Sequence, residues 1–71
     1  MSERLIRARA IAARLPNTAV TMKDRPGSPA GEVSFGMARN LGKPEVHFRA
    51  ARFDEMTDDE IEARLRAEWG L

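Results

Sequence analysis

The sequence predicts an α+β domain with the element order α-β-β-β-α, in which two helices pack on one face of a three-stranded antiparallel sheet. Apolar residues recur with helical spacing near both ends of the chain, and three segments between them alternate apolar and polar side chains. Stretches rich in glycine and proline separate the strands. With 71 residues, the chain is expected to form a single compact domain over residues 1–71.

A first helix is expected from Ser2 to about Leu15, because Ser2 can cap it and Pro16 cannot continue it. Its core-facing residues at helical spacing are Leu5, Ala8, Ile11, Ala12 and Leu15. A second, weaker apolar strip consists of Ile6, Ala10 and Ala13. This strip is either peripheral core or a seam for a partner helix, so a homodimer through these three residues is one prediction.

Three strands are expected at residues 18–23, 32–37 and 45–52. The side chains expected to face the helices are Val20, Met22, Val33, Phe35, Met37, Val46, Phe48 and Ala50. The opposite face, expected to be open to solvent, carries Thr21, Lys23, Ser34, Gly36, His47, Arg49 and Ala51. Phe53 breaks the alternation, which indicates a bulge or the end of the strand.

The last helix is expected to run from Thr57 to about Trp69. Thr57 is a good N-cap residue, and Glu60 stands three positions later, as a capping box requires. Ile61, Leu65 and Trp69 form a narrow apolar stripe, and glycine 70 suits the helix end. The acidic residues of the first turn favour the positive end of the helix dipole, so they are interpreted as structural rather than as a metal site.

No catalytic constellation is recognisable, and the chain is predicted not to be an enzyme. It has no cysteine, and His47 is its single histidine, so neither a thiol nucleophile nor a two-imidazole metal site is available within one chain. No phosphate-binding glycine loop occurs. We therefore expect no cofactor and no metal. Without an apolar run long enough for a membrane span, a soluble cytoplasmic protein with no membrane partner is expected.

The net charge of +1 hides a strong division along the chain. Residues 1–53 contain ten Lys and Arg against four acids, which gives +6, whereas residues 54–71 contain two against seven, which gives −5. Such asymmetry can steer an encounter with a charged partner. Alternatively, the two parts neutralise each other within the compact fold. The sequence alone leaves both interpretations open.

These observations predict a small non-enzymatic binding protein that regulates or inhibits a larger protein assembly with an acidic surface. One form that this function could take is an inhibitor or adaptor of a nucleic-acid-handling complex, of the type encoded by phages or mobile elements. The predicted partner-binding residues are Arg4, Arg7, Arg14, Lys23, Arg25, Arg39, Lys43, His47 and Arg49. Arginine suits this role because its planar fork pairs bidentately with carboxylates. The alternative is direct binding of DNA or RNA by the open sheet face and the basic loops.

Overall fold

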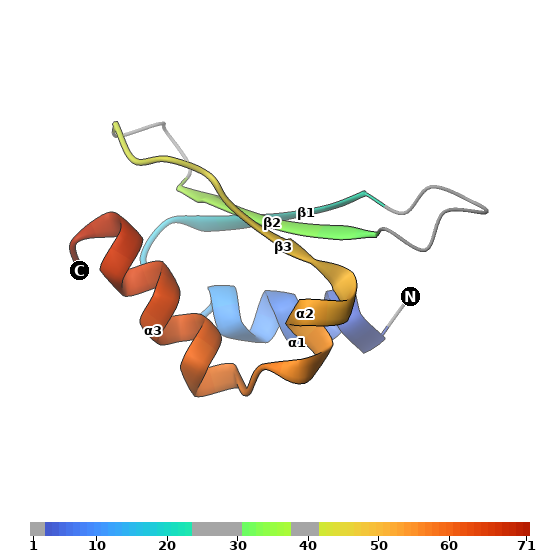
Figure 1. Ribbon diagram of the computed structural model, residues 1–71. Coiled ribbons are helices and arrows are strands. Elements are labelled where there is room, and N and C mark those ends of the chain that lie inside the picture. Colours follow the sequence, from blue (N-terminus) through green and yellow to red (C-terminus); the bar gives the residue numbers. More distant parts are fainter. Residues whose placement is uncertain (1–2, 24–30, 38–41) are drawn as a thin grey trace.

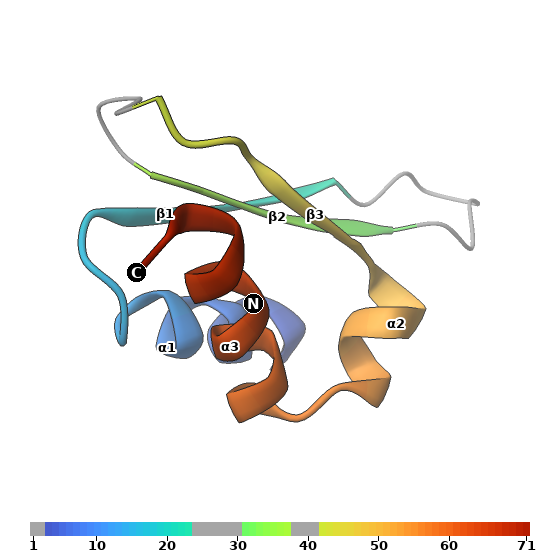
Figure 2. The same ribbon diagram turned by 60° about the vertical axis from the view of Figure 1, so that its left-hand side comes forward.

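The computed structural model describes residues 3–23, 31–37 and 42–71 and confirms the predicted α+β class (Figure 1). Its elements are α1 (Glu3–Ala12), β1 (Thr18–Lys23), β2 (Glu32–Met37), β3 (Val46–Arg49), α2 (Ala50–Glu55) and α3 (Asp58–Trp69). The strands form one antiparallel sheet in the order β1-β2-β3. Two views show the helices together on one side of this sheet, with its other side uncovered (Figures 1 and 2).

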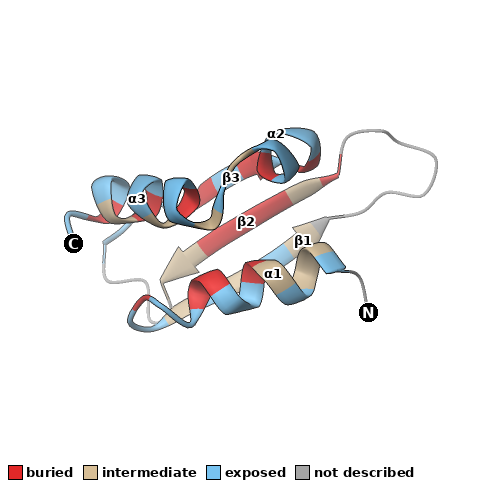
Figure 3. Cartoon of the chain, turned by 90° about the horizontal axis from the view of Figure 1, so that it is seen from below, coloured by how far each residue is buried: buried red, intermediate tan, exposed pale blue. Residues whose placement is uncertain are grey.

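The core lies between the sheet and the helices, and its largest fully buried side chain is Trp69 (Figure 3). The predicted inward sides of β2 and β3 are confirmed, because Val33, Phe35, Val46 and Phe48 belong to the buried cluster. The partly buried residues packed against this cluster are Val20, Met22, Met37 and Met56. The indole Nε1 of Trp69 donates a hydrogen bond of 2.7 Å to the carbonyl oxygen of Pro44, which fastens α3 to the segment before β3.

Helix α1 ends earlier than the sequence predicts. Its regular part stops at Ala12, and the chain then tightens, because the amides of Arg14 and Leu15 each bond to a carbonyl three residues back. Leu15 is nevertheless buried, as its place on the apolar stripe predicts. Asn17, with φ of 49°, makes the left-handed turn into β1.

The prediction of a third strand reaching residue 52 is wrong, because the chain turns into helix α2 at Ala50. The amide of Ala50 still donates to the carbonyl of Gly31 at 2.8 Å, so the sheet ladder extends just to this point. Three residues later on the same helical face, Phe53 is fully buried among the core aromatics. Ala51 is exposed on α2 and is therefore not part of the open sheet face. The broken alternation at Phe53 marks the change from the two-residue side-chain period of a strand to the 3.6-residue period of a helix.

The start and the end of α3 agree with the prediction. Thr57 Oγ1 accepts from the Glu60 amide, and Glu60 Oε1 accepts from the Thr57 amide, so both halves of the capping box are present. Gly70 ends the helix in the left-handed conformation, with φ of 67°. Ile61, Leu65 and Trp69 are fully buried, as their spacing predicts.

Some sequence predictions fall on residues outside the described ranges. These are the cap at Ser2, residues 24–30 of the first turn, and residues 38–41 of the second connection. Arg25 and Arg39 lie in these segments. Among the helices of the described ranges, none is long and apolar enough to span a bilayer.

Candidate functional site

The first group of predicted binding residues lies on α1 and on the turn that follows it, and its members contact acidic residues of the same chain. Arg4 forms a two-pronged pair with Asp54, with Nε 2.9 Å from Oδ1 and Nη2 2.6 Å from Oδ2. The hydrogen bonds from Arg4 lower the pKa of Asp54. Helix α1 is thereby tied to the end of α2.

Arg7 has the least exposed side chain of these three arginines, with 28% of it exposed. Its Nε lies 2.5 Å from Asp58 Oδ1, and its Nη1 donates to the carbonyl of Phe53 at 2.9 Å. Nη2 donates to the carbonyl of Met56. The guanidinium carbon also lies 4.6 Å from the centroid of the Phe53 ring. One arginine therefore holds the turn between α2 and α3 against α1.

Arg14 completes the row by contacting three carboxylates of α3, and its Nη2 lies 3.9 Å from Asp58 Oδ2. Its Nη1 lies 3.1 Å from Asp59 Oδ1 and 3.2 Å from Glu62 Oε1. The hydrogen bonds from Arg66 and then from Arg14 lower the pKa of Glu62. The hydrogen bonds to Glu62 and then to Asp59 raise the pKa of Arg14. The interpretation in which the two parts of the chain neutralise each other thus describes this side of the molecule. Arg4, Arg7 and Arg14 are each paired with carboxylates of the same chain.

The second group lies on the open face of the sheet, where the register arranges residues in cross-strand rows. Thr21, Ser34 and His47 stand side by side across the three strands. Lys23, Glu32 and Arg49 form the neighbouring row. Ala19 and Gly36 form the next pair on the other side, where Glu45 packs beside Gly36. The face is charged at one end and small in side-chain volume at the other.

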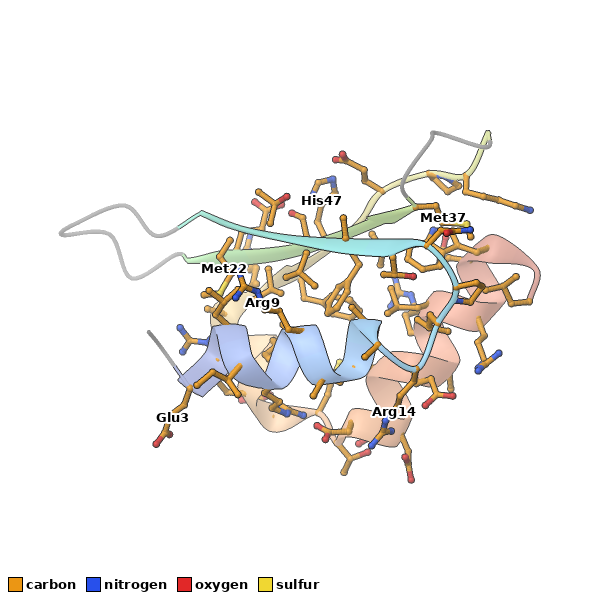
Figure 4. All side chains as sticks on the ribbon, turned by 180° about the vertical axis from the view of Figure 1, so that it is seen from behind. Glu3, Arg9, Arg14, Met22, Met37 and His47 are labelled. Atoms are coloured by element: carbon orange, nitrogen blue, oxygen red, sulfur yellow. The ribbon has the colours of Figure 1, made fainter. Side chains whose placement is uncertain are left out.

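His47 is the centre of a hydrogen-bonded cluster on this face and points away from the helices (Figure 4). Its Nδ1 lies 2.7 Å from Ser34 Oγ and 2.7 Å from Glu32 Oε1. Its Nε2 lies 3.6 Å from Glu45 Oε2. Nδ1 can donate to Glu32 when it carries the hydrogen, or accept the hydroxyl hydrogen of Ser34 when it does not, because one ring nitrogen cannot do both. The geometry thus holds the imidazole between the carboxylates of Glu32 and Glu45.

A shallow hollow of about 290 Å³ lies beside His47. Its lining comes from the small and polar residues of the open face, with contributions from β2 core residues: Ala19, Thr21, Ser34, Phe35, Gly36, Met37, Glu45 and His47. Glu45 forms a carboxylate wall with 71% of its side chain exposed.

The remaining predicted residues belong to the sheet and its connections. Arg49 is exposed and has no ion pair with any residue that the structure describes. Lys43 is exposed close to the C-terminal end of α3. Arg25 and Arg39 lie outside the described ranges, and Lys23 is placed by its register alone. Within the described residues, no group of three side chains could hold a metal ion.

Sequence reasoning missed two partners of His47. Glu45 is recognisable from its spacing on the same strand face, but Ser34 and Glu32 become neighbours only through the β2–β3 register. The acceptors of Arg7 on the α2–α3 turn were also missed, because two of them are backbone carbonyls. The one available signal for the arginine row was the opposite charge of the two parts of the chain.

Comparisons with known proteins add no assignment: no family model matches the chain, and neither a curated protein nor a solved structure matches it.

Proposed function

We propose that this chain is a non-enzymatic binding protein that docks on a larger protein assembly through the open face of its sheet and thereby regulates or inhibits that assembly. The observation that carries the proposal is the one-sided architecture. Helices cover one face of the sheet (Figure 2). The other face presents Arg49, His47 and a shallow hollow. A cytoplasmic location is part of the proposal and is supported by the absence of cysteine.

The partner surface is proposed to be acidic around Arg49 and to offer a polar side chain to the hollow. Arg49 is exposed and unpaired within the described residues, so its guanidinium fork can take a partner carboxylate without breaking an internal contact. The exposed Thr21 lies in the row of His47 and lines the hollow. Arg4, Arg7 and Arg14 are left out of the proposed docking surface, because using them would require breaking their ion pairs with α2 and α3.

The test is affinity purification with the tagged chain, followed by titration of the identified partner in purified form. Arg49→Glu and Thr21→Arg should each weaken binding at least about tenfold, which corresponds to 1.4 kcal/mol. Arg64→Glu is the matched control, because Arg64 is exposed on α3, away from the open face. Loss of binding with Arg64→Glu but not with Arg49→Glu would contradict the proposed surface.

Direct nucleic-acid binding is the second candidate, and the distribution of charge favours it. The segment from residue 18 to residue 49 contains five Lys and Arg against three acids, and it comprises the sheet and its connections. Phosphate contacts release counterions, so binding to DNA or RNA should weaken steeply with salt. Fluorescence anisotropy with labelled duplex and single-stranded probes measures this slope. Absence of binding at low salt eliminates the second candidate.

A further inference from the structure

Three cross-strand rows make up the open face of the sheet, and the two outer rows differ in size. We call them the Arg49 row (Lys23, Glu32 and Arg49), the central row (Thr21, Ser34 and His47) and the Glu45 row (Ala19, Gly36 and Glu45). The Arg49 row consists of long charged residues, whereas the Glu45 row contains an alanine and a glycine. The hollow of about 290 Å³ lies over the Glu45 row and the central row. The face is therefore recessed at one end.

The outer rows also differ in charge. Arg49 is exposed and forms no ion pair with any residue in the described ranges. Glu45 is exposed at the other end, and its Oε2 lies 3.6 Å from His47 Nε2, which is longer than a hydrogen bond. Extended chain separates Glu45 from Arg49 by about 13 Å, so these opposite charges do not meet within one copy. Each of them stands one row away from the central row.

A second copy placed face to face complements both outer rows. With a two-fold axis along the central row, the strands of the two copies run in opposite directions, and Arg49 of each copy lies opposite Glu45 of the other. Each Glu32 lies opposite Gly36 of the second copy. The long residues of one copy therefore stand over the recessed end of the other, and the Arg49 guanidinium reaches the hollow beside Glu45.

The central row can lie over its own copy in this arrangement. It contains no lysine, arginine or carboxylate, and Ser34 is buried within the face. Glu32, the acid of the Arg49 row, lies 2.7 Å from Nδ1 of His47 in its own copy. This contact holds its carboxylate toward the central row. No two like charges of the described side chains therefore stand directly opposite each other.

Charge disfavours the other symmetric way of stacking two open faces. With the axis along the strands, each row lies over itself, so Glu32 faces its own copy and Arg49 faces position 23, a lysine. Like charges placed opposite each other across an interface repel. The helices obstruct neither arrangement, because they lie on the covered side of each sheet (Figure 1). The arrangement of charge therefore selects the axis along the central row.

We infer that the free chain forms a face-to-face dimer through its open face, held by two symmetric Arg49–Glu45 pairs about a two-fold axis along the central row. The face is small and polar, so the dimer is expected to be weak. The inference does not rest on the proposed function, but a second copy and the partner assembly would compete for the same face. Dimerisation would keep the docking surface covered until the partner displaces one copy. The exposed strip of Ile6, Ala10 and Ala13 on α1 takes no part.

Charge reversal tests the inference on the chain alone, by sedimentation velocity at concentrations up to about 1 mM. The wild-type chain should reach twice the mass of 7.9 kDa. Arg49→Glu and Glu45→Arg each place like charges opposite each other, so each should raise the dimer dissociation constant at least about tenfold. The double reversal restores opposite charges and should recover most of the lost affinity. An equimolar mixture of the two single variants should form a heterodimer, because glutamate then faces arginine at both sites. Ile6→Glu is the control on α1 and should leave the dimer intact.

Circular dichroism establishes that each variant is folded. A wild-type chain that stays monomeric at all these concentrations overturns the inference, as does a folded double reversal that dimerises no better than the single variants. Dissociation by Ile6→Glu also overturns it and assigns the seam to α1. The double reversal lacks the Arg49 guanidinium, so it should dimerise but fail to bind the partner of the proposed function. Partner binding that depends on Arg49, in a chain that is monomeric alone, would overturn the dimer and leave the proposed function standing.

Discussion

Replacing Arg7 with alanine should cost a large part of the stability of this domain. The substitution removes a partly buried contact with Asp58, two hydrogen bonds to the carbonyls of Phe53 and Met56, and a cation–π contact with the Phe53 ring. Hydrogen bonds to a charged group contribute about 1.5–3 kcal/mol each, and the ring contact about 0.5–1 kcal/mol. These values do not simply add, because 40% of the Asp58 side chain is exposed and water can replace part of what is lost.

We expect a net loss of about 2 kcal/mol for Arg7→Ala. A domain of 71 residues has a total stability on the order of 4–10 kcal/mol, so this loss is a substantial fraction. With a slope of about 1 kcal/mol per molar urea, the unfolding midpoint should fall by about 2 M. Circular dichroism during urea titration measures this midpoint.

The matched control is Arg64→Ala on α3. Arg64 pairs with Glu68 one turn later, and both side chains are exposed, so its loss should cost less than about 0.5 kcal/mol. Arg7→Lys keeps the charge, but a lysine ammonium cannot contact all the acceptors that the arginine fork contacts. Its urea unfolding midpoint should therefore lie between the midpoints of Arg7→Ala and Arg64→Ala. Equal midpoints for Arg7→Ala and Arg64→Ala would refute the structural role of Arg7.

Three further outcomes follow from the same contacts. Thr57→Ala removes the N-cap acceptor of α3, so unfolding free energy should drop by about 1 kcal/mol and amide exchange in the first turn of the helix should accelerate. Phe53→Ala empties a fully buried site and should cost about 3–5 kcal/mol in calorimetry or urea titration, whereas an exposed strand end would tolerate the change. The folded pKa values of Asp54 and Glu62 lie below their ordinary 3.8 and 4.5. The stability that these carboxylates contribute is therefore complete above their ordinary values and is lost as the pH falls through the lowered ones. Urea midpoints should be level near neutrality and decline below about pH 4.5, and Asp54→Asn should flatten that decline.

The fold was predictable because the informative signals are local. The capping box at Thr57 and Glu60 depends on residues three apart, and the strands depend on alternation with a period of two. Helix α2 was not predicted because its first residues also fit the alternation of β3. The burial of Phe53 against other core aromatics shows that this segment follows the helical period rather than the strand period.

The candidate site was less predictable because it depends on long-range pairing. Arg7 and Asp58 are 51 residues apart, and nothing in their own neighbourhoods identifies them as partners. The division of charge along the chain was compatible with internal ion pairs and with a charged partner. The packing of α1 against α3 was needed to show that internal ion pairs form. The environment of His47 likewise required the β2–β3 register.

Arg4, Arg7 and Arg14 are used internally, and for this reason we propose the sheet as the interaction surface. A double-mutant cycle on Arg7 and Asp58 tests this internal use most directly, because it cancels the separate effect of each residue on its own helix. We expect a coupling energy of about 1 kcal/mol or more between Arg7→Met and Asp58→Asn. Additive losses of stability, with coupling near zero, would contradict it and return these arginines to the surface available for a partner.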